Sequence, residues 1–169
     1  MAVAGVIFLL LGFAAWRDIA TRTIPDAVSV GLVMLGLAAR IPDGLQAVGL
    51  SAGAAVLLFL LLIPLHGRGL IGGGDLKLLA SLAFGLPPLA SYQMVCAVVM
   101  AGGVLAVFYL MLRHVLARRG IARRWVARHR SLALRVIAVE IWRIRKGAPL
   151  PYGLAIAAGA SFVIGHSGA

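Results

Sequence analysis

Apolar runs separated by short polar or glycine-rich breaks make up most of this chain. Runs of this length and composition are typical of helices that cross a membrane. They predict about six spans, at residues 3–16, 24–39, 45–65, 76–86, 89–112 and 150–164. Several runs are shorter than the roughly 20 residues that a spanning helix needs. Flanking polar residues are therefore expected to lie partly within the membrane.

The composition agrees with this pattern. The chain is 62% hydrophobic with a mean hydropathy of +1.04, well beyond a soluble globular domain. Residues 1–13 lack the basic start of a secretory signal, so we take them as part of the first helix. Cys96 is the single cysteine, which excludes an internal disulfide or a cysteine zinc site and indicates a packing residue. We expect an all-α polytopic membrane protein with one membrane-embedded domain, residues 1–169.

The distribution of basic residues predicts the orientation, because Lys and Arg gather on the cytoplasmic side of a membrane. If the first helix runs from outside to inside, the cytoplasmic loops hold Arg17, Arg22, Arg68, Lys77 and the basic segment 113–148. Of the 16 Lys and Arg residues, only Arg40 then lies outside. The N-terminus is expected outside, and Asp18 and Asp75 both fall at the cytoplasmic side, at similar depth.

Asp75 ends the run Gly72-Gly73-Gly74-Asp75, and a carboxylate at hydrocarbon depth is expensive unless it has a use. Two neighbouring carboxylates share a proton, so Asp18 and Asp75 could activate water and polarise a peptide carbonyl without a metal or a cofactor. Glycines lack Cβ and tolerate positive φ, which would let an extended substrate approach. A glycine-rich turn followed by Asp is equally an ordinary helix cap. The pattern by itself leaves both interpretations open.

Three motifs resemble those of the type IV prepilin peptidases, which are aspartic membrane proteases with a GxGD signature. Gly72-x-Gly74-Asp75 with Leu76-Lys77-Leu78 is similar to that signature, and Asp18-Ile-Ala-Thr-Arg-Thr-Ile-Pro25-Asp26 to their other aspartate motif. The third match, Pro151-Tyr152-Gly153, resembles the opening of the last helix. The resemblance implies that Asp18 and Asp75 are the catalytic dyad. It also implies supporting or substrate-binding roles for Gly72, Gly74, Lys77, Pro25, Asp26, Pro151, Tyr152 and Gly153.

The resemblance further implies a substrate and a location. Such enzymes cut a short basic leader from a prepilin, before its apolar helix, at the cytoplasmic face of the bacterial inner membrane. The paired cysteines that accompany N-methylation in bifunctional members have no counterpart here, and the size resembles the short peptidases of tight-adherence (Flp) pili. We expect peptidase activity and leave methylation open.

Two local features complete the motif around Asp18. Pro25 disfavours helix at Ile24, which predicts a break before the second helix. Asp26 is interpreted as the cap of that helix in preference to a third acidic group of the site.

The remaining features receive structural interpretations or stay as alternatives. The basic segment 113–148 is amphipathic and is expected to lie on anionic lipid headgroups, with Glu140 facing Arg143 or a neighbour. We expect no nucleic-acid partner, and the histidines lack metal-ligand spacing. One alternative is a Ser–Lys dyad of Ser81 and Lys77, one helical turn apart. Another is a small cation or proton transporter, or a channel subunit, that uses the same two aspartates.

Overall fold

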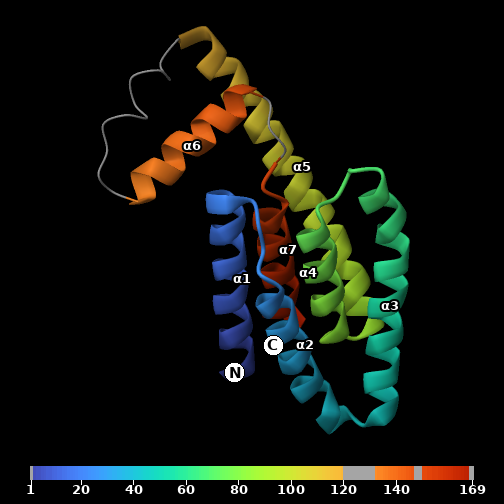
Figure 1. The fold of residues 1–169 in the computed structure, drawn as a ribbon. Coiled ribbons are helices and arrows are strands. Elements are labelled where there is room, and N and C mark those ends of the chain that lie inside the picture. The colour runs from blue at the N-terminus through green and yellow to red at the C-terminus, as the bar shows by residue number, and fades with distance from the viewer. Residues whose placement is uncertain (1, 120–131, 147–149, 168–169) are drawn as a thin grey trace.

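The structure, a computed structural model, describes residues 2–119, 132–146 and 150–167 (Figure 1). Within these ranges the chain is helical and contains no strand, which confirms the all-α prediction. The helices are α1 (Ala2–Thr21), α2 (Asp26–Arg40), α3 (Leu45–Gly67), α4 (Gly73–Phe84), α5 (Pro88–Arg119), α6 (Leu132–Lys146) and α7 (Tyr152–Ser167), with the short 3-10 helix η1 (Ile41–Asp43).

Among the described residues, three helices are long and apolar enough to cross a membrane. These are Val3–Thr21 in α1, Leu45–Gly67 as α3, and Pro88–Val115 in α5. The other predicted spans coincide with α2, α4 and α7, which have 15, 12 and 16 residues. At 1.5 Å per residue these helices are shorter than the roughly 30 Å hydrocarbon core. Length therefore supports three of the predicted spans.

The first five helices run up and down in sequence order (Figure 1). The α1–α2 and α3–α4 connections consequently lie at one end of the bundle, and η1 lies at the other. Helix α7 packs against α5 and α1, while α4 lies between α2 and α3. Gly36 makes the α2–α4 contact close, because a Cβ added there would be 2.6 Å from the Cα of Gly85.

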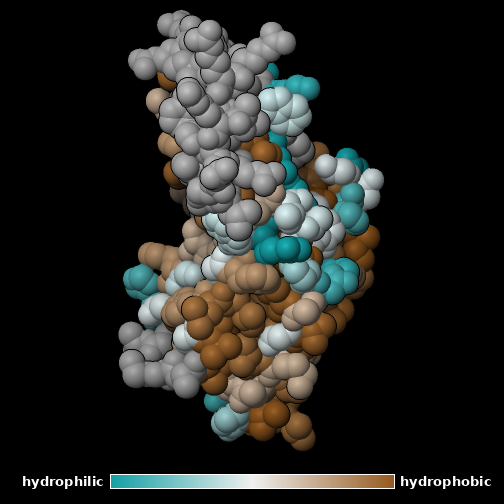
Figure 2. Space-filling view, turned by 60° about the vertical axis from the view of Figure 1, so that its left-hand side comes forward, coloured by the Kyte–Doolittle hydropathy of each residue, from teal (hydrophilic) through white to brown (hydrophobic). Residues whose placement is uncertain are grey.

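The exterior of the bundle is largely hydrophobic. Leu9 of α1, Leu61 of α3 and Val104 of α5 are 75%, 61% and 70% exposed. Figure 2 shows hydrophobic side chains gathered on the lower part of one face, with hydrophilic ones above them. An apolar exterior of this extent suits contact with lipid rather than water.

The start of α2 confirms one local prediction and contradicts another. Residues 22–25 are not helical and separate α1 from α2, as Pro25 predicts. Asp26, however, is not the cap: Pro25 occupies the N-cap position with extended backbone angles (φ −64°, ψ 137°), and no side chain caps the helix. Because the extended ψ of Pro25 already supplies the turn into the helix, Asp26 becomes its first residue, and its carboxylate is available for another partner.

Helix α5 is longer than the apolar run that predicted it. It has 32 residues, about 48 Å, so one end must project beyond a hydrocarbon core of roughly 30 Å. Helix α6 packs against α5 and the end of α1 (Figure 1). It buries Glu140 and Ile144 and exposes Trp142, in keeping with an amphipathic helix. Residues 120–131 and 147–148 of the predicted basic segment lie outside the described part of the chain.

Candidate active site

Asp18 lies in the last turn of α1 and is 7% exposed. Its Oδ2 accepts a hydrogen bond of 2.8 Å from the backbone amide of Gly153, in the first turn of α7. The positive end of the α7 dipole therefore faces this carboxylate. A Cβ at position 153 would lie 2.9 Å from the Cβ of Asp18, so this approach requires glycine. The Pro151-Tyr152-Gly153 motif thus supplies the start of α7 that Asp18 contacts.

Asp75 is the third residue of α4, and Gly72 is the N-cap. The backbone of Gly72 hydrogen-bonds to the Asp75 carboxylate, as a residue at this helical position often bonds back to its cap. The Oδ1 atom of Asp75, by contrast, is buried and has no hydrogen-bond partner among the described residues. Asp75 therefore caps its helix with one oxygen and leaves the other available. Both interpretations of the glycine–aspartate run are compatible with this arrangement.

Asp75 lies outside the three long apolar helices, and its environment disfavours the ionised form. Burial, followed by the nearby charge of Asp18, raises the pKa of Asp75 to about 6. The Gly72 hydrogen bond and the charge of Arg22 oppose this rise. A carboxyl group with such a pKa exchanges its proton near neutral pH, as acid–base catalysis requires.

Asp18 and Asp75 face the same space. A cavity of about 240 Å³ is lined by both carboxylates and by Asp26, Arg22, Thr23, Ile24 and the Gly72–Gly74 turn. A second cavity, of about 420 Å³, is also lined by both carboxylates, with Arg22, Arg143, Leu150, Tyr152 and residues 69–72. A water molecule occupies roughly 30 Å³ of liquid. The two cavities therefore have room for water molecules and for a short segment of bound peptide beside the two carboxylates.

The glycines of the turn are used for space, not for positive φ. Gly72 has φ −67° and ψ 145°, and Gly73 and Gly74 are helical, so none of the three uses the positive φ that glycine tolerates. A Cβ on Gly72 would lie 2.8 Å from Asp75 Oδ2, and one on Gly74 would lie 3.2 Å from the Cβ of Ile24. The missing Cβ atoms allow the turn to pack between Asp75 and the α1–α2 connection.

Arg22 is a site residue that the sequence analysis used only for orientation. It follows α1 directly with φ 58°, and its amide donates to the Asp18 carbonyl at 2.9 Å, which ends the helix. Arg22 lines both cavities, and its guanidinium pairs with Glu140 of α6. Its place inside the first aspartate motif was the available signal. Arg22 thus puts a positive charge beside the two carboxylates.

Glu140 holds this arginine and joins α6 to the bundle. It is 8% exposed, and it accepts hydrogen bonds from Arg22, from Tyr109 Oη at 2.9 Å and from Arg143 Nη1 at 3.3 Å. Arg143 Nη1 also donates to the Ile19 carbonyl at 2.8 Å. Glu140 therefore faces Arg143, as expected, and also a neighbour from another helix. The cluster fastens α6 to the end of α1 that carries Asp18.

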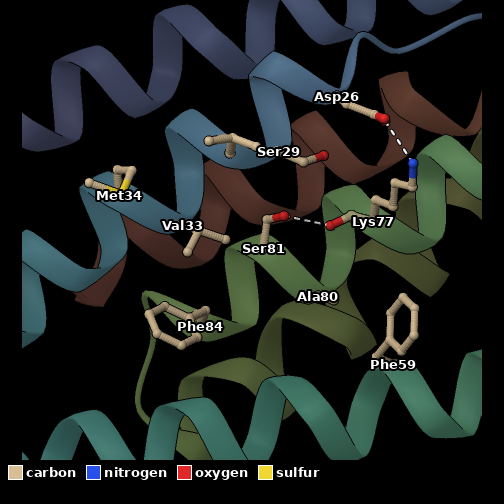
Figure 3. Close-up of a pocket in the computed structure, with 10 residues that line it drawn as sticks. Asp26, Ser29, Val33, Met34, Phe59, Lys77, Ala80, Ser81 and Phe84 are labelled. Carbon is tan, nitrogen blue, oxygen red and sulfur yellow. Dashed lines mark hydrogen bonds and ion pairs between the residues drawn. The ribbon is translucent and has the colours of Figure 1, made fainter.

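The side chains of Lys77 and Ser81 each bond to a group other than one another. Lys77 Nζ lies 2.8 Å from Asp26 Oδ1, and the Ser81 hydroxyl donates to the Lys77 backbone carbonyl at 2.6 Å (Figure 3). The ammonium and the hydroxyl are thus each bonded elsewhere, which argues against the Ser–Lys alternative. Lys77 is not among the residues that line the two cavities of Asp18 and Asp75, whereas its partner Asp26 lines the smaller one.

No described group of three or more His, Cys, Asp or Glu side chains could hold a metal ion. The structure is thus that of an apolar helical membrane protein in which two aspartates line the same cavities. The sequence model of the type IV leader peptidase family matches residues 5–110, and the chain belongs to this family. The family implies a protease. No match is found among curated proteins or among solved structures.

The matched residues hold Asp18, Asp75 and the glycine turn, but not α6 or α7. The contribution of these two helices to the site consequently follows from the structure. Helix α7 contributes the amide of Gly153, and α6 contributes Glu140 and Arg143.

Proposed function

We propose that this chain is an aspartic endopeptidase of the bacterial inner membrane that removes the short basic leader from type IV, Flp-like prepilins. Asp18 and Asp75 would activate the attacking water. One observation carries the proposal: both carboxylates line the same two cavities, and Asp75 keeps a buried oxygen without a partner among the described residues. Membership of the type IV leader peptidase family agrees with it.

The chemistry needs one proton shared by two carboxyl groups. The amide of Gly153 holds Asp18 in place by a hydrogen bond, and the ionised Asp18 would take a proton from water as the water oxygen attacks the scissile carbonyl. Asp75, with its raised pKa, donates its proton to the carbonyl oxygen. Collapse of the tetrahedral intermediate then breaks the C–N bond, and the departing amine receives a proton from the dyad.

The distribution of charge supports a cytoplasmic site. Arg17 and Arg22 lie at the end of the bundle that carries Asp18 and Asp75, and Arg68 follows α3 at the same end. Arg40 lies at the opposite end, where it pairs with Asp43 at 2.6 Å. By the positive-inside rule the carboxylate end faces the cytoplasm. In this arrangement α2, α4 and α7 complete six spans, with polar residues at their ends within the interface.

Co-expression with a prepilin precursor tests the proposal. Asp18→Asn and Asp75→Asn should each abolish removal of the leader, measured as a mobility shift and by mass spectrometry. Asp43→Asn is the matched control, because this exposed aspartate pairs with Arg40 at the other end of the bundle and should leave processing unchanged. Full processing by either active-site variant would contradict the proposal. Ion uptake into proteoliposomes without proteolysis would favour the transporter alternative instead.

A further inference from the structure

An apolar groove runs beside the site, between α2 and α3. Helix α4 packs extensively against both of these helices, which have little contact with each other, so α4 forms the floor and α2 and α3 form the walls. The groove has a volume of about 440 Å³. Its apolar lining comes from all three helices (Figure 3): Val30, Val33 and Met34 from α2, Phe59 from α3, and Ala80 and Phe84 from α4.

The groove begins at the active site. The ion pair of Asp26 and Lys77 stands at one end of it, and Met34 and Phe84 stand at the other (Figure 3). Asp26 also lines the smaller cavity that holds Asp18 and Asp75. Positions 26 and 34 are about 12 Å apart along α2, at 1.5 Å per residue. The groove therefore extends roughly two helical turns away from the carboxylates.

We propose that this groove binds the apolar helix of the precursor, the segment that follows the scissile bond; the inference rests on the proposed function. The order of the substrate matches the order of the surfaces. An extended cleavage segment at Asp18 and Asp75 would lead directly past Asp26 into the groove, where apolar side chains from three helices surround the next two turns. Ala80 leaves room on the floor for a substrate helix to approach closely.

The charges at the mouth favour a peptide helix over a lipid chain. A substrate helix that begins just after the scissile bond points its free backbone N–H groups and positive dipole end toward the active site. The Asp26 carboxylate, which is 71% exposed, lies where it can accept from them. Cleavage adds a positive α-amino group at the same place. A lipid acyl chain has neither feature, so Asp26 would contribute nothing to its binding.

Photocrosslinking tests the position of the substrate helix. Benzoylphenylalanine is placed at Met34 or, as the matched control, at Val104 on the lipid-facing side of α5; these residues are 61% and 70% exposed. Both crosslinking variants also carry Asp75→Asn, so that the precursor is bound but not cut. We expect about tenfold more precursor adduct at Met34, in line with a local preference of about 1.4 kcal/mol. Lipid adducts alone at Met34, or equal precursor adducts at both positions, would overturn the groove assignment.

Kinetics with the precursor give an independent measurement. Ala80→Trp and Val33→Trp fill the groove and should each raise KM about tenfold while kcat stays within about twofold. Val104→Trp, the control, should change neither constant. Unchanged KM in both groove variants would refute the proposal. The experiments distinguish a failure of the proposed function from a failure of the groove assignment. If the wild-type enzyme leaves the precursor uncut, the proposed function is refuted. If cleavage is normal but no adduct forms at Met34, only the groove assignment is refuted.

Discussion

The carboxylate of Asp18 in α1 accepts a 2.8 Å hydrogen bond from the backbone amide of Gly153 in α7, 135 positions later in the chain. This bond joins the first and last helices at the site. It also explains why the first turn of the last helix contains glycine at position 153, since any Cβ there would press against Asp18. The position of one of the two site carboxylates thus depends on a helix outside the matched family region.

We predict that Gly153→Ala reduces leader cleavage by about 100-fold, because a displacement of about 1 Å in a catalytic group can have this effect. The added Cβ would lie 2.9 Å from the Cβ and 3.0 Å from Oδ2 of Asp18, so the carboxylate must move. Initial rates with a purified precursor measure the loss. Gly103→Ala is the control, since nothing lies within 4 Å of a Cβ there. Equal losses in both variants would show that Asp18 is not specifically displaced.

Most of the helices could be predicted from the sequence, because apolar runs are a local pattern, whereas the catalytic role of Asp18 and Asp75 stays a prediction. Apolar runs predict where helices lie, and the glycine turn predicts the start of α4. The pairing of Arg22 with Glu140 had no such signal, since the residues are 118 positions apart and the partner of a basic loop residue is not encoded locally. Hydropathy also missed the last turns of α5, because residues 113–119 are helical but largely polar.

Asp75 should make the protein less stable as pH rises. Its pKa is about 6 in the folded state against 3.8 as the ordinary value, so between these pH values the folded chain keeps a proton that the unfolded chain has lost. Unfolding free energy therefore falls from about pH 4 to pH 6 and stays low above it. Each pKa unit is worth about 1.4 kcal/mol, which gives roughly 3 kcal/mol in total.

We predict that Asp75→Asn, which cannot ionise, raises the thermal unfolding midpoint at pH 7.5 and has little effect at pH 4. Thermal unfolding in detergent micelles at both pH values measures the difference. The exposed Asp43, substituted by Asn, should show no comparable pH-dependent gain. A wild-type protein whose midpoint rises from pH 4 to pH 7.5 relative to Asp75→Asn would contradict the raised pKa.

Glu140→Gln should destabilise the protein by about 2 kcal/mol, less than the roughly 3–5 kcal/mol of a fully buried ion pair. The substitution removes the negative charge that Arg22 and Arg143 face. These two side chains are 22% and 20% exposed, so water partly compensates and the loss of unfolding free energy is smaller. Tyr109→Phe removes one hydrogen bond to Glu140 without changing charge and should cost about 1 kcal/mol. Unfolding in detergent compares the two, and a larger effect of Tyr109→Phe would refute the charge argument.

Ser81→Ala should retain most of the cleavage activity. Its hydroxyl is bonded to the Lys77 carbonyl of its own helix, and the Lys77 ammonium is bonded to Asp26, so neither group is free to act as nucleophile or base. Lys77→Met should lower the free energy of unfolding by less than about 1 kcal/mol, because both side chains of the Lys77–Asp26 ion pair are half exposed or more. Initial rates with the precursor measure the effect of Ser81→Ala on cleavage, and unfolding measures the effect of Lys77→Met on stability. Loss of cleavage in Ser81→Ala, with a normal unfolding midpoint, would restore the Ser–Lys dyad and displace Asp18 and Asp75 from the mechanism.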